Sequence, residues 1–219
     1  MTHNLEVDGI QFNSGERKIL TSIYLKCTTG KITGLLGRNG QGKTCLMNII
    51  YGSLEATSKS IRFDNISISN AFKRQGILLY LPQFNFIPNS LTLKRIFSDF
   101  NLQYSEFELY FPEFQSKYRY PIKHLSAGQR RLIEVYVIIM AKSHFAILDE
   151  PFSHLMPLHI EKIKEILIQE KMSKGFIITD HLYLQIIDVC DSLYLLSDGK
   201  THLTKSISDL KTLGYISRL

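Results

Sequence analysis

The residues best suited to chemistry lie in one glycine-rich stretch, Gly37-Arg38-Asn39-Gly40-Gln41-Gly42-Lys43-Thr44. This stretch fits G-x-x-x-x-G-K-[ST], the pattern of a phosphate-binding P-loop. Its glycines allow backbone N–H groups to turn toward an anion and to approach it closely. Lys43 is expected to reach the β- and γ-phosphates of a nucleotide, and the Thr44 hydroxyl is expected to ligate Mg²⁺.

The segments on either side decide between a P-loop and a chance glycine-rich turn. Ile32–Leu36, before the stretch, is an apolar run that predicts a buried strand, and residues 45–50 after it predict the start of a helix. The positive end of that helix dipole would face the phosphates. Because strand, loop and helix in this order are the context that the motif requires, we predict a nucleotide site.

A second apolar run, residues 145–148, ends in two carboxylates, Asp149 and Glu150. In an open α/β sheet, ligands bind at the carboxyl ends of the strands. Asp149 is therefore a candidate to hold Mg²⁺ through water, and Glu150 is a candidate general base for an attacking water. The alternative is a strand followed by an ordinary polar turn, but the P-loop upstream favours the Mg²⁺ site.

A third segment, Leu125-Ser126-Ala127-Gly128-Gln129, precedes a long apolar-periodic stretch. Ser126 and Gln129 have the spacing of a capping box, which predicts that a helix begins here. Gly128 is unfavourable in a first turn, by up to about 1 kcal/mol relative to alanine. A glycine is expected at such a position when another group must approach the backbone closely, and a helix N-terminus is an anion site.

Apolar strands and helical stretches alternate along most of the chain, which predicts an α/β domain with a largely parallel sheet. Further strands are expected at residues 5–12, 19–27, 60–67, 77–81, 176–179 and 193–196, and helices at 91–100, 126–141, 157–172 and 182–190. Residues from about 84 to 125 interrupt the alternation with aromatic and charged side chains, so we expect an inserted helical subdomain there. The whole chain, 1–219, is expected to form a single domain that carries this insertion.

The composition excludes several other classes of protein. The 219 residues are 44% hydrophobic, which is enough for a sizeable core. The longest apolar run, residues 135–141, is far shorter than a membrane span. The first residues lack the basic and apolar regions that a signal peptide has. The three cysteines, Cys27, Cys45 and Cys190, are widely spaced. This spacing favours a protein of a reducing compartment and argues against a zinc site of the common kinds. The net charge of +6 is scattered rather than clustered, so no nucleic acid partner is expected.

In this order the segments resemble the nucleotide-binding domain of ABC (ATP-binding cassette) transporters. The glycine-rich stretch matches the Walker A motif, and Leu148-Asp149-Glu150-Pro151 matches Walker B. Residues 125–129 are similar to the LSGGQ signature, with Ala127 in place of its first glycine. The resemblance extends from about residue 5 to residue 200 and implies a P-loop NTPase cassette: a RecA-like mixed sheet core, an antiparallel β subdomain and an inserted helical subdomain.

Three single residues also match the family pattern. Gln83, after Tyr80-Leu81-Pro82, matches the Q-loop glutamine, and His181, after Thr179-Asp180, matches the switch histidine. Phe12 falls where the family places the aromatic residue that stacks on adenine. Each match is uninformative alone, and the order of all the motifs together makes coincidence implausible.

The resemblance implies that ATP and Mg²⁺ bind between two cassettes arranged head to tail. One cassette would contact ATP through Phe12, Gly37, Arg38, Asn39, Gly40, Gln41, Gly42, Lys43, Thr44 and Cys45. The other would contact the same ATP through Ser126, Ala127, Gly128 and Gln129. Mg²⁺ would be held by Thr44, Gln83 and Asp149, and hydrolysis would depend on Glu150, His181 and Gln83.

The resemblance also implies two protein partners: a second cassette, identical or different, and a membrane-spanning permease subunit. The permease would dock on the helical insertion and hold the chain at the cytoplasmic face of the membrane. The alternative is a soluble ABC-type ATPase acting on ribosomes, nucleic acid or cluster assembly. Such proteins usually carry tandem cassettes or a long coiled coil, and neither pattern is present in these 219 residues. The signature segment disfavours a P-loop kinase.

The D-loop departs from the family pattern. After the Walker B glutamate the family usually has Pro-Thr-Ser-Gly-Leu-Asp, whereas this chain has Pro151-Phe152-Ser153-His154-Leu155-Met156. Met156 thus replaces an aspartate in a loop that, in the family, crosses the dimer interface. Glu150 is retained, so we expect hydrolysis, but hydrolysis that is slower or less cooperative.

Overall fold

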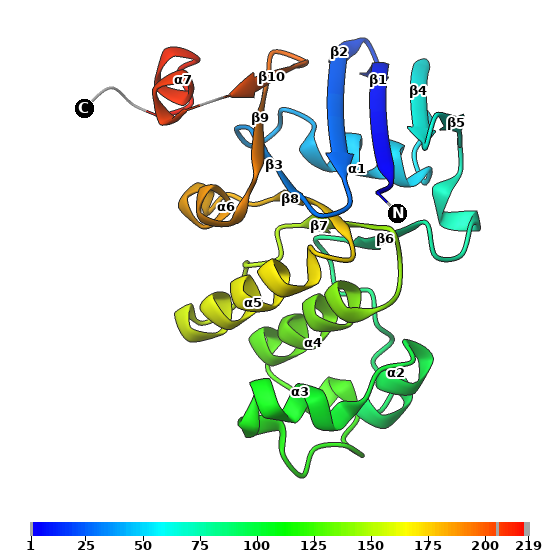
Figure 1. Cartoon of the computed structure of the whole chain (residues 1–219), viewed down its shortest axis with the longest axis vertical. Coiled ribbons are helices and arrows are strands. Elements are labelled where there is room, and N and C mark those ends of the chain that lie inside the picture. The colour runs from blue at the N-terminus through cyan, green and yellow to red at the C-terminus, as the bar shows by residue number, and fades with distance from the viewer. Residues whose placement is uncertain (1, 205, 217–219) are drawn as a thin grey trace.

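A mixed sheet of ten strands organises residues 2–204 and 206–216, which the computed structural model describes (Figure 1). The strands are β1 (Asn4–Ser14), β2 (Arg17–Thr28), β3 (Ile32–Leu36), β4 (Ser58–Phe63), β5 (Ile66–Ser67), β6 (Leu78–Leu81), β7 (Phe145–Asp149), β8 (Gly175–Thr179), β9 (Ser192–Ser197) and β10 (Lys200–Thr204). Their order across the sheet is β5-β4-β1-β2-β10-β9-β3-β8-β7-β6. The helices are α1 (Lys43–Tyr51), α2 (Leu93–Asp99), α3 (Tyr104–Tyr110), α4 (Ala127–Met140), α5 (Pro157–Glu170), α6 (Tyr183–Val189) and α7 (Ile207–Thr212).

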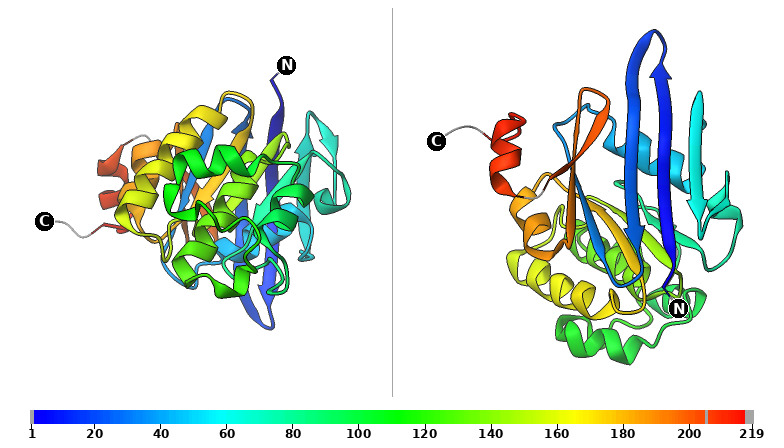
Figure 2. Two further views of the ribbon diagram at one scale, coloured as in Figure 1. Left: turned by 90° about the horizontal axis from the view of Figure 1, so that it is seen from below. Right: turned by 45° about the horizontal axis from the view of Figure 1, so that its top comes forward.

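The sheet changes character along its width. β6, β7, β8, β3 and β9 pair in parallel, whereas β10 is antiparallel to β9 and meets β2 by one parallel pair, Lys200 with Ser22. Beyond β10, strands β2, β1, β4 and β5 are antiparallel, and β1 and β2 form the long hairpin seen in Figure 2. The expected α/β fold, with a mixed core sheet and an antiparallel β region, is confirmed.

The central parallel strands are buried on both faces, which explains why they are continuous apolar runs. Ala146 and Leu148 belong to a core shared with α4, α5 and α6, whereas Phe145 and Ile147 belong to a second core shared with α1. Since β3 and β7 are parallel and separated only by β8, their carboxyl ends lie at the same edge of the sheet. That edge therefore carries the P-loop and Asp149 together.

The helical region lies at the far end of the molecule from the β1–β2 hairpin (Figure 1). α2, α3 and two short 3-10 turns lie between β6 and α4, so the predicted 84–125 insertion is helical. Its core continues into α4, because the ring centroids of Phe97 and Phe107 lie 6.0 and 4.8 Å from the ring centroid of Tyr136. That the 84–125 insertion forms a separate subdomain stays a prediction. Among the described residues, no helix is both long and apolar enough to cross a membrane.

Some local expectations are wrong or incomplete. The single strand expected at 60–67 is two strands, β4 and β5, because Asp64 and Asn65 have φ values of +50° and +65° and form a tight turn. Strand β10 and helix α7 have no counterpart in the sequence-based expectations, and α3 is expected only as part of the helical insertion. β10 is short and largely polar, and it is held as the second strand of a hairpin whose turn, Asp198-Gly199, also has positive φ.

Candidate nucleotide-binding site

The P-loop connects β3 to α1, and close packing explains two of its glycines. A Cβ atom on Gly37 would lie 2.8 Å from the carbonyl oxygen of Leu196, and one on Gly42 would lie 2.6 Å from Cγ2 of Ile19. Gly42 also has φ +98°, a left-handed conformation that glycine adopts without strain. The course of the loop is therefore set by the strands packed against it, before any ligand binds.

Lys43, the first residue of α1, turns back into the loop. Its Nζ donates to the carbonyl oxygens of Gly37 at 2.6 Å and Arg38 at 3.4 Å, and the residue is 8% exposed. Burial lowers the pKa of Lys43, while Glu150 and Asp149 act in the opposite direction. No side chain caps α1, so its first amides are left for an anion.

A cavity of about 650 Å³ lies against the P-loop, a volume typical of small-ligand pockets. Three predicted catalytic residues, Gln83, Glu150 and His181, share its lining with the P-loop although they come from three separate segments. The other lining residues are Ser14, Ile19, Asn39, Gly40, Gly42, Lys43, Thr44 and Cys45. The structure thus brings most of the predicted single-chain site together.

Asp149 is buried at the end of β7 and is 1% exposed. Its Oδ2 accepts from the Tyr80 hydroxyl at 3.2 Å, whereas its Oδ1 has no hydrogen-bond partner among the described residues. Burial raises the pKa of Asp149, and the nearby Thr44 and Tyr80 hydroxyls act in the opposite direction. A buried, incompletely partnered carboxylate beside a hydroxyl suits Mg²⁺, which prefers oxygen ligands.

The described residues contain no cluster of three or more histidine, cysteine or acidic side chains that would hold a metal ion alone. Mg²⁺ is usually bound by one or two protein ligands together with substrate phosphates and water, which is the role predicted for Thr44 and Asp149.

Glu150 and His181 form one wall of the cavity. The Glu150 backbone has φ +53°, and its amide donates to the Thr179 carbonyl oxygen at 2.7 Å. Glu150 Oε2 accepts from Ser153 Oγ at 3.2 Å and lies 3.6 Å from His181 Nδ1. The His181 side chain is 53% exposed, so it can reach a ligand in the cavity. A carboxylate next to an imidazole can move a proton and stabilise developing charge.

The signature segment begins α4, as predicted. Ser126 Oγ accepts from the Gln129 amide at 3.2 Å, and Gln129 Oε1 accepts from the Ser126 amide at 3.2 Å, which completes the capping box. A Cβ atom on Gly128 would lie 2.7 Å from the His154 carbonyl oxygen. The glycine is therefore required by a close approach from this chain's own D-loop. Among the described residues that line the cavity, none comes from this segment.

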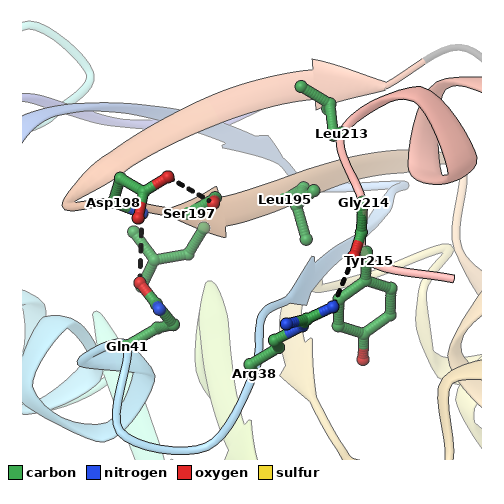
Figure 3. Close-up of a pocket in the computed structure, with 9 residues that line it drawn as sticks. Arg38, Gln41, Leu195, Ser197, Asp198, Leu213, Gly214 and Tyr215 are labelled. Carbon is green, nitrogen blue, oxygen red and sulfur yellow. Dashed lines mark hydrogen bonds between the residues drawn. The ribbon is translucent and has the colours of Figure 1, made fainter. Parts of the chain in front are cut away.

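Gly37 and Asp149 lie outside the cavity lining, and so do Phe12, Arg38 and Gln41. Phe12 is partly buried against the core shared with α1. In a second pocket beside the P-loop, Arg38 Nη2 donates to the Gly214 carbonyl oxygen at 2.6 Å, and Gln41 Oε1 accepts from the Asp198 amide at 3.0 Å (Figure 3). These two side chains tie the P-loop to the β9–β10 turn and the C-terminal segment. Contact of Phe12, Arg38 and Gln41 with ATP stays a prediction.

Tyr80 is a site residue that the sequence reasoning missed. Its hydroxyl accepts from Asn48 Nδ2 at 3.3 Å and donates to Asp149, so it links α1 to β7. Burial raises the pKa of Tyr80, with Asp149 acting in the same direction, and this keeps the hydroxyl a donor. The available signal was a single polar residue in a strand whose other residues are all leucine.

Comparisons with known proteins agree with this geometry. The family model described as ABC transporter matches residues 20–153. LptB of Escherichia coli (strain K12), a lipopolysaccharide export system ATP-binding protein, is 30% identical over 203 residues, which cover 84% of this chain and 82% of that protein. MglA of Treponema denticola, a galactose/methyl galactoside import ATP-binding protein, is 26% identical over 223 residues, or 93% of this chain and 44% of that protein.

A solved ATP-binding subunit of an ABC transporter has the same fold, with a TM-score of 0.81 at 21% identity over 96% of this chain and 93% of that one. The family match covers more than half of the chain and includes the P-loop, Gln83, the signature segment and both Walker B carboxylates. ATPase activity is what membership in this family implies. The chain therefore belongs to the family of ABC transporter ATP-binding proteins.

Proposed function

We propose that this chain is the ATP-hydrolysing subunit of an ABC transporter, in which two cassettes close head to tail around ATP and drive a membrane-spanning partner. The cavity against the P-loop carries this proposal, because Lys43, Glu150 and His181 meet there. A phosphate-binding loop, a carboxylate and an imidazole in one cavity favour transfer of a phosphoryl group to water.

Four side chains of the cavity have separate proposed roles. Lys43 and the first amides of α1 hold the phosphates, and Glu150 takes a proton from the attacking water. His181 donates to the γ-phosphate, where charge stabilisation is most valuable. Gln83 contacts the same water and links the cavity to the helical region that follows it.

Thr44 and Asp149 are the residues that would hold Mg²⁺, with Gln83 as a third ligand. The unpartnered Oδ1 of Asp149 supports this assignment. When bound, the ion neutralises charge on the phosphates of the substrate. Tyr80 then fixes the other carboxylate oxygen, so that Asp149 presents one oxygen to the site.

The second half of the ATP site comes from another cassette, identical or different. Ser126 and Ala127 are exposed, and their segment does not line the cavity of its own chain in the part that the structure describes. Head-to-tail pairing brings Ser126 and Gly128 of one cassette to the γ-phosphate bound by the other.

A membrane-spanning partner is proposed to dock on the helical region and to hold the chain at the cytoplasmic face of the membrane. Phe84 supports this placement, because it directly follows Gln83 and is 71% exposed. Movement of the Q-loop would then be transmitted to the partner as ATP binds and is hydrolysed.

The altered D-loop is proposed to slow hydrolysis or to reduce its cooperativity. Met156 is 59% exposed and offers no acceptor or charge at the interface where the family has an aspartate. Binding of ATP to the P-loop does not involve this residue and is expected to be unaffected.

A Glu150→Gln variant tests the proposed function. We expect ATP hydrolysis to fall roughly 100-fold or more, since a general base contributes about that factor, with ATP binding retained. ATP-dependent dimerisation of this variant is measured by light scattering after size-exclusion chromatography. Glu161→Gln, at a carboxylate that is 60% exposed on α5, is the matched control and should behave as wild type.

Each part of the function can fail separately. Wild-type hydrolysis by Glu150→Gln would contradict the role of this carboxylate, and a monomer at saturating ATP would contradict the two-cassette site. Capture of a multi-span protein from detergent-solubilised membranes supports transport. Capture of ribosomes or nucleic acid instead would favour the soluble alternative.

A further inference from the structure

The second turn of α4 contains a buried pair of opposite charges. Arg131 is 3% exposed and Glu134 is 0% exposed, and Arg131 Nη1 lies 3.8 Å from Glu134 Oε2. Removing two charges from water is unfavourable, and an apolar pair of similar volume is often at least as stable. Stability alone is therefore a weak explanation for this pair, and its hydrogen bonds indicate another use.

Arg131 donates to three backbone carbonyl oxygens. Its Nη1 bonds to Pro82 at 2.8 Å, and its Nη2 bonds to Asp149 at 2.8 Å and to Glu150 at 3.0 Å. Pro82 directly precedes Gln83, and Asp149 ends β7. One guanidinium thus joins the backbone beside the Q-loop glutamine to the backbone of both Walker B carboxylates.

Two other side chains of α4, Glu134 and Arg130, bind the segment that follows Gln83. Glu134 Oε1 accepts from the Ile87 amide at 3.3 Å and from Arg130 Nε at 3.2 Å. Arg130 donates in turn to the Ile87 carbonyl oxygen and to Oδ1 of Asn89. The segment from Pro82 to Asn89 is therefore anchored to α4 on both sides of Gln83.

The backbone of Glu150 depends on such anchoring. A non-glycine residue at φ +53° is strained, and it persists only where its surroundings hold it. The Glu150 amide is held by the Thr179 carbonyl oxygen, and the Glu150 carbonyl oxygen is held by Arg131. The same guanidinium therefore helps to aim the Glu150 carboxylate into the cavity.

We propose that Arg131 is a positioning residue for ATP hydrolysis: it sets Gln83 and Glu150 relative to each other and makes both move with the signature helix. This inference rests on the proposed function, in which Glu150 is the catalytic carboxylate. Arg131 itself is buried, does not line the cavity and acts only through the two backbone segments that it joins.

Arg131→Lys and Arg131→Gln test the proposal. A lysine keeps the charge but cannot span three carbonyl oxygens with one planar group. We expect kcat for ATP hydrolysis to fall roughly 10- to 100-fold, because small misplacements of catalytic groups have effects of that size. The Kd for a fluorescent ATP analogue should change by less than about threefold, since Lys43 and the P-loop are untouched.

Lys174→Met is the matched control for lost stability, because Lys174 is also buried and also bonds α4 carbonyls, but at the opposite end of the helix. It should lower Tm without changing kcat. The proposal is overturned if the Arg131 variants lose no more kcat than Lys174→Met at an equal loss of Tm. Equal losses in kcat and in ATP affinity would also overturn it, since they indicate general disruption.

A double variant separates this inference from the function on which it rests. Because Arg131 acts in part through Glu150, Arg131→Lys should cause a smaller loss of hydrolysis in a Glu150→Gln background than in the wild type. Losses that multiply would contradict the positioning role while leaving Glu150 as the base. Wild-type hydrolysis by Glu150→Gln alone would instead contradict the catalytic role of Glu150, on which this inference rests.

Discussion

The N-termini of α1 and α4 are constructed in opposite ways. α1 follows Gly42, no side chain caps it, and its first turn opens on the cavity. α4 follows Ser126, and a complete capping box with Gln129 occupies the amides of both residues. A phosphate at α1 meets no competing acceptor, whereas one at α4 has to compete with the chain's own cap. The N-terminus of α1 therefore has free amides for a ligand, whereas the N-terminus of α4 is capped by its own side chains.

Their C-termini differ as well. α1 ends at Gly52, which has φ +93° and whose amide bonds to Asn48 and Ile49. α4 ends where Lys174 Nζ donates to the carbonyl oxygens of Ile139 and Ala141, both at 2.5 Å. A side chain from the residue just before β8 therefore closes the last turn of α4. Changes at the N-terminus of α1 should affect mainly ligand binding, whereas changes at the two ends of α4 should affect mainly stability.

The largest effect is expected at α1. Lys43→Met should lower ATP affinity and turnover roughly 100-fold, as the loss of a preorganised donor to phosphate does. Tm without ATP should change little, because the lysine only bonds carbonyl oxygens of its own loop. Fluorescent ATP titration and a phosphate-release assay measure both, with Lys94→Met, at an exposed position of α2, as control. A large loss of Tm would show that this end is structural, and the contrast between the helices would disappear.

The next effect concerns the C-terminus of α4 and depends on pH. Burial lowers the pKa of Lys174 from 10.5 to about 8. Between these values the unfolded chain still binds the proton that the native chain has released, so stability rises with pH. The gain should be at most about 3 kcal/mol, since one pKa unit corresponds to about 1.4 kcal/mol.

Urea unfolding of wild type and Lys174→Met across pH 8 to 10.5 measures this gain as a difference, which removes the contribution of other titrating groups. The wild type should become more stable relative to the variant as pH rises. A constant difference would mean that Lys174 stays charged in the fold, and that α4 is closed by a cation in favourable contact with its dipole.

A smaller effect is expected at the N-terminus of α4. Gly128→Ala places a Cβ atom 2.7 Å from the His154 carbonyl oxygen, and a backbone oxygen cannot move away as a side chain can. We expect a loss of about 1–3 kcal/mol in the free energy of unfolding, as for other overpacked positions. Ala127→Ser, at the exposed neighbouring position, controls for the change in composition. Unchanged stability of Gly128→Ala would show that the D-loop can yield, and that the glycine serves only a ligand.

The same two helices show what could be predicted from the sequence. The strand before the P-loop has the predicted bounds, 32–36, and the capping box of Ser126 and Gln129 forms as its spacing indicates. Both signals are local: an apolar run beside glycines, and two side chains three residues apart. Local patterns were also sufficient to place Asp149 and Glu150 at the end of a strand.

The remaining features of the site are contacts between distant segments. The Tyr80–Asp149 hydrogen bond joins residues 69 positions apart, and Arg131 reaches Pro82 across 49 positions. Gly128 could be recognised as unusual, but nothing local indicated that the group approaching it is the carbonyl of His154. Periodicity predicts which face of an element is buried; it does not predict which polar group meets it there.

The smallest effect is expected at a third helix N-terminus, that of α5. Met156 precedes Pro157 at the N-cap position and provides no side-chain cap. Met156→Asp therefore changes two things at once: it restores the D-loop carboxylate and it caps α5, which should stabilise the fold by about 0.5–1 kcal/mol. Met156→Ser caps the helix without adding a carboxylate. Both variants should raise Tm, but only Met156→Asp should raise the rate or cooperativity of ATP hydrolysis. If neither variant changes hydrolysis, the D-loop substitution is neutral, and a rise with serine as well would assign the effect to the cap of α5.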